Sequence, residues 1–390
     1  MSFNILKNMS IFYFLSSILI LTSSCSKVDD NSIKIGHVAP LTGNQAHLGK
    51  DNEAGAILAI NDLNSSDIVI NGKPAKFVLI SEDDAADPKQ GTAAAQKLID
   101  SEVVGVIGHL NSGTTFPAST MYYRAGIPQI SPSATLPKYT QQGYETAFRV
   151  VANDVQLGGG LGNYAVKNLN AKTVAVIDDR SAYGAGVAEE FKKGFEISGG
   201  SVVTHQYTND KSTDFFAILT TIKSKSPDII FFGGMDAVAG PMIRQLKQLA
   251  IDVPFIGGDG ICTAELPKLA GKAIGVKKIY CAEAGGLLDE ASIKKNNDFR
   301  DRFKNETGKE VKLYSPYVYD ATKILVEAMK VADSSDPKIF SKEISKINYL
   351  GVTGPISFDQ NGDVRNASLT IYTYEFEKKK VVEVIKSTGN

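Results

Sequence analysis

The sequence is poor in cysteine, histidine and net charge, and each shortage narrows the possible functions. Its 42 Lys and Arg residues nearly balance 43 Asp and Glu residues, which gives a formal net charge of -1. Because charges of both signs are spread along the chain, we expect a solvated surface and no nucleic-acid partner. The histidines lack the spacing of metal ligands: His37, His47, His109 and His205. We therefore expect no metal and no other cofactor.

Motifs of common enzymes are also missing. Ser112 is not part of a GxSxG nucleophile elbow, because Leu110 occupies the first glycine position, and no Walker A sequence occurs. The glycines from Gly158 to Gly162 do not satisfy GxGxxG and are expected to permit close helix packing. No nucleophile and base are arranged as in a secreted hydrolase, so the sequence predicts that the protein is not an enzyme.

Only the amino terminus has a long apolar run. Lys7 precedes an uncharged stretch from Met9 to Leu21, and small residues then lead to Cys25, which is the layout of a secretory signal. The stretch is shorter than the roughly 20 residues of a membrane-spanning helix. Small residues before a cysteine resemble a lipobox, although Thr22 stands where that motif usually has Leu. We expect a signal peptide over residues 1–25, a lipid on Cys25 and a tether over 26–32; cleavage nearby without lipid stays open.

Two further cysteines remain once Cys25 is assigned. Cys262 and Cys281 could form a disulfide in an oxidising compartment. They could equally be small buried core residues, because free cysteine is among the most buried residue types. The sequence leaves both alternatives open.

From Ile33 onward, short β-branched runs alternate with amphipathic stretches, which is typical of parallel sheets with helices on both faces. Strands are predicted at Ile33–Ala39, Phe77–Ile80, Val103–Ile107, Ile127–Ile130, Thr173–Ile177, Ser201–Tyr207, Asp228–Phe232, Pro254–Ile256 and Ile279–Ala282. Helices are predicted at Pro88–Ile99, Ala291–Glu306, Tyr314–Val331 and Pro337–Ile347. The pattern forms two blocks that meet near Val151. We therefore expect an α/β fold with two doubly wound, Rossmann-like parallel sheets.

The carboxyl-terminal segment has a different pattern. Ser368–Phe376 and Val381–Ile385 alternate like the strands of an antiparallel hairpin, and a turn is predicted at Lys378–Lys380.

Polar loops follow several of the predicted strands, where doubly wound sheets bind their ligands. The loop His109–Thr115 contains hydroxyls beside a predicted helix start, which suits a carboxylate. The loop Ser131–Pro137 repeats this chemistry, and Asp259 follows a third strand, where it could pair with an ammonium group. Helix capping by Ser112 or Thr114 and ordinary turns remain the simpler interpretations of these loops.

Taken together, these segments resemble the type I periplasmic binding proteins that serve branched-chain and hydrophobic amino acid transporters. The resemblance rests on APLTGNQAHLG from Ala39, EDDAADPKQ from Glu82, VIGHLNSGTTFPAS from Val106, IPQISPSATLP from Ile127, DRSAYGAG from Asp179, FFGG from Phe231 and GVTGPISFDQNG from Gly351. It spans most of the chain, from Ile33 to about Asp363.

The resemblance implies roles for individual residues. Ser112 and Thr135 would bind the carboxylate of an amino acid, the Ser133 carbonyl and Asp259 would bind its ammonium group, and Tyr183 would close over it. Further pocket residues would be Leu48, Leu110, Asn111, Ala134, Met235, Asp236, Gly260 and Tyr314. The chain departs from the family where Leu48 and Met235 replace aromatic residues, where Asp259 replaces a longer glutamate, and where Ala86 and Asn111 replace a cysteine pair.

The resemblance also implies an architecture and partners. Residues 33–153 with 283–360 would form one lobe, and residues 154–282 with 361–390 the other. Three hinge crossovers are expected near Val151–Asp154, Ala282–Gly285 and Asp359–Asn361. The implied function is an exported, monomeric amino acid receptor, periplasmic or on the cell surface, that serves an inner-membrane ABC permease with a cytoplasmic ATPase. A ligand sensor of the same fold is the alternative, and another small carboxylate or amide could be the ligand.

Overall fold

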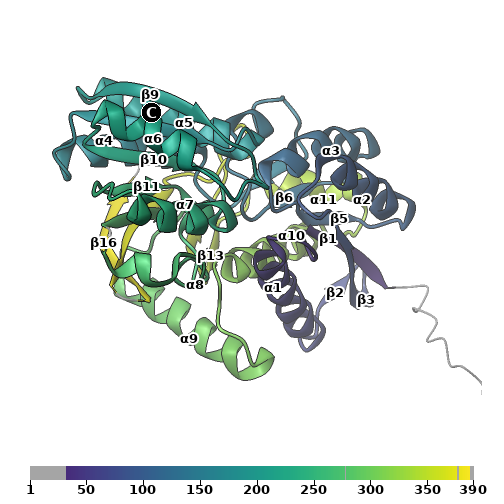
Figure 1. Cartoon of the computed structure of the whole chain (residues 1–390). Coiled ribbons are helices and arrows are strands. Elements are labelled where there is room, and N and C mark those ends of the chain that lie inside the picture. The colour runs from purple at the N-terminus through teal and green to yellow at the C-terminus, as the bar shows by residue number, and fades with distance from the viewer. Residues whose placement is uncertain (1–31, 277, 376, 387–390) are drawn as a thin grey trace, which may run out of the picture.

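The computed structural model describes residues 32–276, 278–375 and 377–386. The predicted signal peptide, Cys25 and residues 26–31 of the predicted tether lie outside these ranges. Over the described ranges, no helix combines the length and the apolar composition that crossing a bilayer requires. The elements form two lobes, each built around its own sheet (Figure 1).

The first lobe contains a five-stranded parallel sheet with the order β4-β1-β5-β6-β7. Its strands are β1 (Ile33–Ala39), β4 (Phe77–Asp83), β5 (Gly105–Gly108), β6 (Gln129–Ser131) and β7 (Ala147–Arg149). Apolar side chains of α1 (Ala46–Asn64), α10 (Ser315–Ala332) and α11 (Pro337–Ile344) pack on one face. Those of α2 (Pro88–Asp100) and α3 (Ser112–Ala125) pack on the other. Both faces are therefore covered, as the near-continuous apolar strands predicted.

The second lobe contains a seven-stranded sheet with the order β16-β15-β12-β11-β10-β8-β9. Its parallel strands are β8 (Thr173–Asp178), β9 (Ser201–Tyr207), β10 (Ile229–Gly233), β11 (Phe255–Gly257) and β12 (Ile279–Glu283). The antiparallel strands β15 (Ser368–Glu375) and β16 (Lys378–Lys386) extend it. Apolar residues of α4 (Asp154–Lys167) and α5 (Ala182–Ile197) cover one face, and those of α6 (Phe216–Lys225), α7 (Asp236–Gln248) and α8 (Leu266–Ala270) cover the other.

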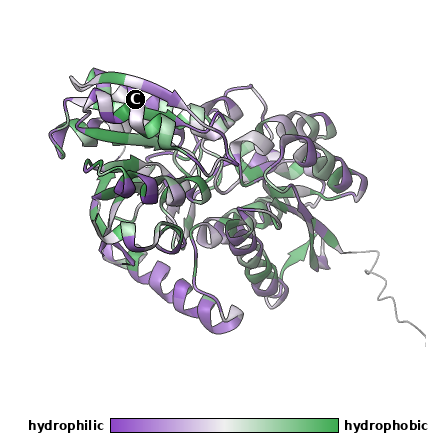
Figure 2. Cartoon of the chain, in the orientation of Figure 1, coloured by the Kyte–Doolittle hydropathy of each residue, from purple (hydrophilic) through white to green (hydrophobic). Residues whose placement is uncertain are grey.

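Glycines on α4 allow this helix to lie close to α5, as expected. A Cβ atom on Gly158 would lie 2.6 Å from the Val187 carbonyl oxygen, and one on Gly162 would lie 2.4 Å from that of Phe191. Hydrophobic residues line the strands, whereas α9 (Glu290–Thr307) is hydrophilic over most of its length (Figure 2).

In both lobes the strand order reverses direction next to the first strand, between β1 and β5 and between β8 and β10. Loops that follow these strands leave the sheet at its carboxyl edge, where doubly wound folds bind ligands. The loop before α3 follows β5, the loop Pro132–Leu136 follows β6, and Asp259 follows β11. The predicted binding loops thus lie at the carboxyl edges of the two sheets.

Three chain segments connect the lobes. After β7, the Ala152 N–H donates to the Ala284 carbonyl (2.9 Å), so the first and second connections lie side by side. The third connection comes after Gly362, whose carbonyl accepts from the Arg149 N–H (3.0 Å). The predicted crossover near Asp359–Asn361 stays a prediction. The exact residue bounds of the two lobes stay a prediction.

Arg149 carries a fully buried positive charge at the end of β7. Its Nε donates to Asp363 Oδ1 (2.5 Å), and its Nη1 donates to the carbonyls of Ala134 and Leu136 (both 2.9 Å). Its Nη2 donates to Thr140 Oγ1 (2.7 Å). A buried guanidinium is tolerated only when it is paired and hydrogen-bonded, so this network fixes the loop after β6 against the third connection.

The predicted strands match the observed ones in place, with ends that differ by up to a few residues. The hairpin differs most, because Glu375 pairs with Lys378 and the residues Lys378–Lys380 lie within β16. The turn predicted at Lys378–Lys380 is therefore wrong. Prediction missed short strands, whose few residues show no periodicity: β2 (Val69–Ile70), β3 (Lys73–Pro74), β7, β13 (Tyr349–Gly351) and β14 (Gly354–Ile356).

Replacing Asp363 by Asn should lower the free energy of unfolding by about 3–5 kcal/mol, because the buried Arg149 charge would lose its counter-charge. Urea unfolding followed by circular dichroism measures this loss. Asp298→Asn is the control, because Asp298 pairs with Lys294 on the surface and exposed pairs contribute little. A loss for Asp363→Asn no larger than that of the control would show that the buried pair is dispensable.

Candidate functional site

A small cavity lies between the lobes. Its volume is about 10 Å³, which is room for about one water molecule. All the residues that line it belong to the predicted site: Leu110, Asn111, Ser112, Ser133, Tyr183, Met235, Asp259 and Tyr314. The structure therefore brings together residues up to 204 positions apart in the sequence, as between Leu110 and Tyr314.

Asp259 places a buried carboxylate in this cavity. It begins the short 3-10 helix η2 (Asp259–Ile261), and its exposed fraction is 1%. Tyr183 Oη donates to Oδ1 (2.7 Å) from the same lobe, and Tyr314 Oη donates to Oδ2 (2.9 Å) from the first lobe. The Gly260 N–H donates to Tyr183 Oη (3.0 Å). Both carboxylate oxygens thus have neutral donors, and one bond crosses the cleft.

Burial controls the protonation of these groups. It raises the pKa of Asp259 to about 6, although the hydrogen bonds from Tyr183 and Tyr314 act in the opposite direction. Burial and the Asp259 charge raise the pKa of both tyrosines well above its usual value, so both remain hydroxyl donors. At neutral pH the cavity therefore holds an ionised carboxylate, and no cationic side chain of the described residues lies at hydrogen-bond distance from it, which favours a cationic group of a ligand.

On the opposite side, hydroxyl residues join the loops that follow β5 and β6. Ser112 Oγ accepts from the Leu136 N–H (3.3 Å), and Ser133 Oγ donates to the Leu110 carbonyl (2.9 Å). The residue that caps α3 is Asn111, which makes no side-chain cap, and Thr114 Oγ1 donates to its carbonyl (3.1 Å). Helix capping by Ser112 or Thr114 is therefore wrong as an explanation of these hydroxyls.

Several buried polar atoms beside the cavity have no hydrogen-bond partner within the described residues. They include Asn111 Oδ1, which lines the cavity, and Asp236 Oδ1. The Thr135 hydroxyl and the Asp154 carboxyl are also buried, but they interact with each other, because a hydrogen bond from Thr135 opposes the rise in the pKa of Asp154. Buried polar groups are almost always satisfied in native structures. The unpartnered atoms are therefore those that a bound ligand or its water molecules could satisfy.

Asp154 is a residue that sequence reasoning missed. It is the first residue of α4, fully buried, and its N–H donates to the Thr135 carbonyl (2.8 Å). Burial raises the pKa of its carboxyl to about 8. In the sequence it stands at a helix start after the first crossover, where an acidic residue normally indicates only capping. Its closeness to Thr135 depends on the tertiary fold, so no local signal could have revealed it.

Asp51 is a second missed residue, and it holds Tyr314 in place. This nearly buried carboxylate on α1 accepts the N–H groups of four consecutive residues at 2.8–3.1 Å, from Lys312 to Ser315. Ser315 Oγ donates to it as well (3.0 Å). A carboxylate at a helix amino terminus satisfies otherwise unpaired donors. Asp51 thus fixes the start of α10 and the tyrosine that precedes it.

Further contacts cross the cleft. His47 Nε2 lies 2.9 Å from Asp236 Oδ2, which also accepts from Thr263 Oγ1 (2.5 Å). Burial lowers the pKa of His47, but the hydrogen bond and charge of Asp236 outweigh this and raise it. Lys312 pairs with Glu265 nearby. Asp236 thus faces His47 and Thr263 in the contact between the lobes and is not among the residues that line the small cavity. Its role as a pocket residue stays a prediction.

The remaining predicted residues lie around the cavity. Leu48 is fully buried and packs in the apolar cluster that contains Leu110, Tyr183 and Met235. Ala134 is buried and gives its carbonyl to Arg149. A wider pocket of about 440 Å³ shares Asn111, Tyr183 and Met235 with the small cavity and includes polar residues of both lobes.

Within the described ranges, no group of three or more His, Cys, Asp or Glu side chains could hold a metal ion.

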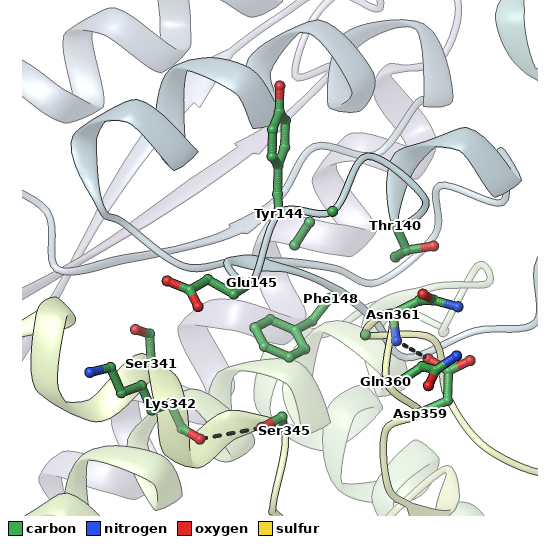
Figure 3. Close-up of a pocket in the computed structure, with 13 residues that line it drawn as sticks. Thr140, Tyr144, Glu145, Phe148, Ser341, Lys342, Ser345, Asp359, Gln360 and Asn361 are labelled. Carbon is green, nitrogen blue, oxygen red and sulfur yellow. Dashed lines mark hydrogen bonds between the residues drawn. The ribbon is translucent and has the colours of Figure 1, made fainter.

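A separate hollow of about 320 Å³ lies between the segment Thr140–Phe148, α11 and the loop Asp359–Gly362 (Figure 3). Ser341, Lys342 and Ser345 of α11 line one side of it. None of the predicted site residues lies in this hollow.

A family of periplasmic binding proteins matches residues 32–380. The chain belongs to this family. Leu/Ile/Val-binding protein homolog 1 of Brucella abortus is 35% identical over 88% of this chain and 90% of its own length. A leucine-, isoleucine-, valine-, threonine- and alanine-binding protein of Pseudomonas aeruginosa is 31% identical over the same shares.

Solved structures agree with this membership. A leucine-binding protein, LivK, of Thermotoga maritima superposes with a TM-score of 0.83 and 27% identity, over 91% of this chain and 99% of its own. LivJ of Streptococcus pneumoniae in complex with isoleucine superposes with a TM-score of 0.81 and 29% identity, over the same shares. The type I periplasmic binding protein fold predicted from sequence is confirmed.

In this periplasmic binding protein, Asp154→Asn should change how stability depends on pH. The pKa of Asp154 is about 8 in the folded protein and has a usual value of 3.8, so between these values the folded state keeps a proton that the unfolded chain has lost. The contribution of Asp154 to the stability of the unliganded protein therefore falls as pH rises from about 4 to about 8.

The Asn variant lacks this fall, and at pH 8 it should exceed the original protein in free energy of unfolding by at least about 2 kcal/mol. Urea unfolding at pH 4 and pH 8 measures the difference, with Asp298→Asn as the exposed control. Equal stabilities at pH 8 would mean that Asp154 ionises without penalty.

Proposed function

We propose that this periplasmic binding protein is the substrate-binding component of an ABC importer and captures a neutral L-amino acid of small or medium size. The observation that carries the proposal is the placing of a buried carboxylate opposite hydroxyl-bearing loops around one cavity. A zwitterion presents one cationic and one anionic end. Such a site can recognise both ends at once, because charge-assisted hydrogen bonds each contribute roughly 1.5–3 kcal/mol when shielded from water.

The residue roles in this proposal are those that the family resemblance implies. Ser112 and Thr135 receive the ligand carboxylate, and Asp259 with the Ser133 carbonyl receives the ammonium group. The buried Thr135 hydroxyl and the buried Asp259 carboxylate support these roles. Tyr183 covers the ligand, while Leu48, Leu110 and Met235 surround its side chain with apolar atoms. The relatives named for binding leucine, isoleucine and valine support an apolar side chain.

Binding requires the lobes to open and close. The cavity of about 10 Å³ is too small for an amino acid, so a ligand enters when the lobes separate about the three connections. Opening breaks the Tyr314–Asp259 bond and the His47–Asp236 contact. Closure around a ligand excludes water and brings the surfaces of both lobes into one arrangement, which the permease can recognise.

The same proposal includes the place of action. The protein is exported, anchored through a lipid on Cys25, and acts as a monomeric receptor without enzymatic activity beside an inner-membrane permease and its cytoplasmic ATPase. The signal-like amino terminus supports export. A lipid anchor would keep the receptor close to its permease.

Isothermal titration against the twenty common L-amino acids should show binding to neutral members, with leucine, isoleucine, valine and alanine among the ligands. 4-Methylpentanoate, which resembles leucine without its ammonium group, should bind at least about tenfold more weakly, because Asp259 would lose its partner. Binding of such acids without binding of any amino acid would exclude the proposed role of Asp259.

The double variant Ser112→Ala with Thr135→Ala should weaken binding of the amino acid ligand by about 100-fold or more, since two bonds to its carboxylate are lost. The matched control is Ser341→Ala with Ser345→Ala, which removes two hydroxyls from the hollow in Figure 3. The control should bind like the original protein. Loss of binding in the control alone would move the site to that hollow.

The same variants test transport. A strain that lacks the gene should lose uptake of the labelled amino acid, and the original gene should restore it, whereas the Ser112/Thr135 variant should not. If uptake persists in the deletion strain while a response to the amino acid disappears, the protein is a sensor.

A further inference from the structure

The loop that carries Asp259 has little regular structure of its own. After β11 it forms the three-residue helix η2, and Cys262 follows directly, with its N–H donating to the Asp259 carbonyl (2.9 Å). Such short 3-10 segments have poor hydrogen-bond geometry and depend on their surroundings. The position of the carboxylate is therefore set by whatever holds the residues just behind it.

A disulfide joins Cys262 to Cys281 of β12, which settles the alternative that the sequence left open. Both residues are fully buried. Strand β11 leads into the Asp259 loop, and β12 pairs with it in parallel, with Cys281 beside Gly257. The disulfide therefore joins the end of the Asp259 loop to the strand that neighbours β11. The loop is thus closed covalently three residues from Asp259.

The carboxyl-terminal hairpin holds the same loop from behind. Tyr374 Oη of β15 lies 3.1 Å from the Ile261 carbonyl oxygen and 2.9 Å from that of Thr263. Lys379 Nζ of β16 donates to the Cys262 carbonyl (2.9 Å) and also pairs with Glu283 at the end of β12. Three consecutive carbonyls are therefore held by side chains of the two antiparallel strands.

We propose that the Cys262–Cys281 disulfide, together with Tyr374 and Lys379, positions Asp259 for the ammonium group of the ligand, so that affinity depends on the formed disulfide. This inference rests on the proposed function. Charged groups give their full energy only when held within about 0.5 Å of the productive place. A loop that is ordered before binding also loses less entropy on binding. The disulfide suits an oxidising compartment, where it would persist.

The decisive comparison is between oxidised protein, fully reduced protein and the variant Cys262→Ala with Cys281→Ala, each titrated with L-leucine and L-alanine. Thiol labelling and mass spectrometry of the two cysteine peptides verify the redox state. Reduction should weaken binding at least about tenfold, the double-alanine variant should match the reduced protein, and reductant should not affect that variant. Equal affinities of the oxidised and reduced forms would overturn the proposal.

A general loss of stability must be separated from mispositioning. Leu219→Ala removes a fully buried side chain from α6 of the same lobe, and it should lower the unfolding temperature while leaving affinity unchanged. Tyr374→Phe keeps the disulfide and removes one anchor of the loop, and it should weaken binding several-fold. If affinity simply follows unfolding temperature across these variants, the disulfide is only structural.

A measurement without ligand distinguishes failure of this inference from failure of the proposed function. Burial raises the pKa of Asp259 to about 6, and carboxyl carbon NMR can follow this titration, with Asp259→Asn to assign the signal. Loosening the loop admits water, so reduction should move the pKa of Asp259 down toward its usual value. An unchanged titration overturns the positioning role whether or not any amino acid binds. Absence of amino acid binding to the oxidised protein, with the pKa shift present, would instead refute only the proposed function.

Discussion

The structure depends on one buried positive charge, that of Arg149. An isolated guanidinium in a protein interior is strongly unfavourable, so its surroundings must supply acceptors in fixed places. Asp363 supplies the counter-charge, and its other oxygen accepts from Asn153 just before α4 (3.0 Å). The carbonyls of Ala134 and Leu136 supply further acceptors. A binding loop, the start of the second lobe and the third connection are thus tied to a single side chain, and none of them can shift independently.

The cleft presents the complementary situation, a buried negative charge whose partners are neutral. Asp259 is stabilised by two tyrosine hydroxyls, which compensate only part of its desolvation, as the raised pKa shows. An ammonium group would complete that compensation. Because Tyr314 belongs to the other lobe and is fixed by Asp51, the same carboxylate can serve both the ligand and the contact between lobes. In the proposed function, recognition and closure therefore depend on the same carboxylate.

Much of this could be predicted from sequence. Runs rich in β-branched residues predicted β1 and β9 to the residue, because such residues favour extended backbone over several consecutive positions. The polar loops that follow the predicted strands, together with the family resemblance, predicted every residue that lines the small cavity. The pairing of Arg149 with Asp363, 214 positions apart, could not be predicted, nor could the complete burial of Asp154. Both arise from tertiary contacts that leave no periodic trace. The disulfide could not be predicted without the strand register, which places Cys281 beside the Asp259 loop.

The strand β16 forms an open edge of the seven-stranded sheet and begins with three lysines, Lys378 to Lys380. An unpaired edge offers its backbone groups to any other extended chain, and charged side chains there discourage such pairing by repulsion between copies. Lys379 also donates a hydrogen bond to the Cys262 carbonyl of the Asp259 loop. The same short segment thus disfavours pairing of β16 with the edge strand of another copy. Such pairing becomes more frequent when many copies are concentrated on one surface.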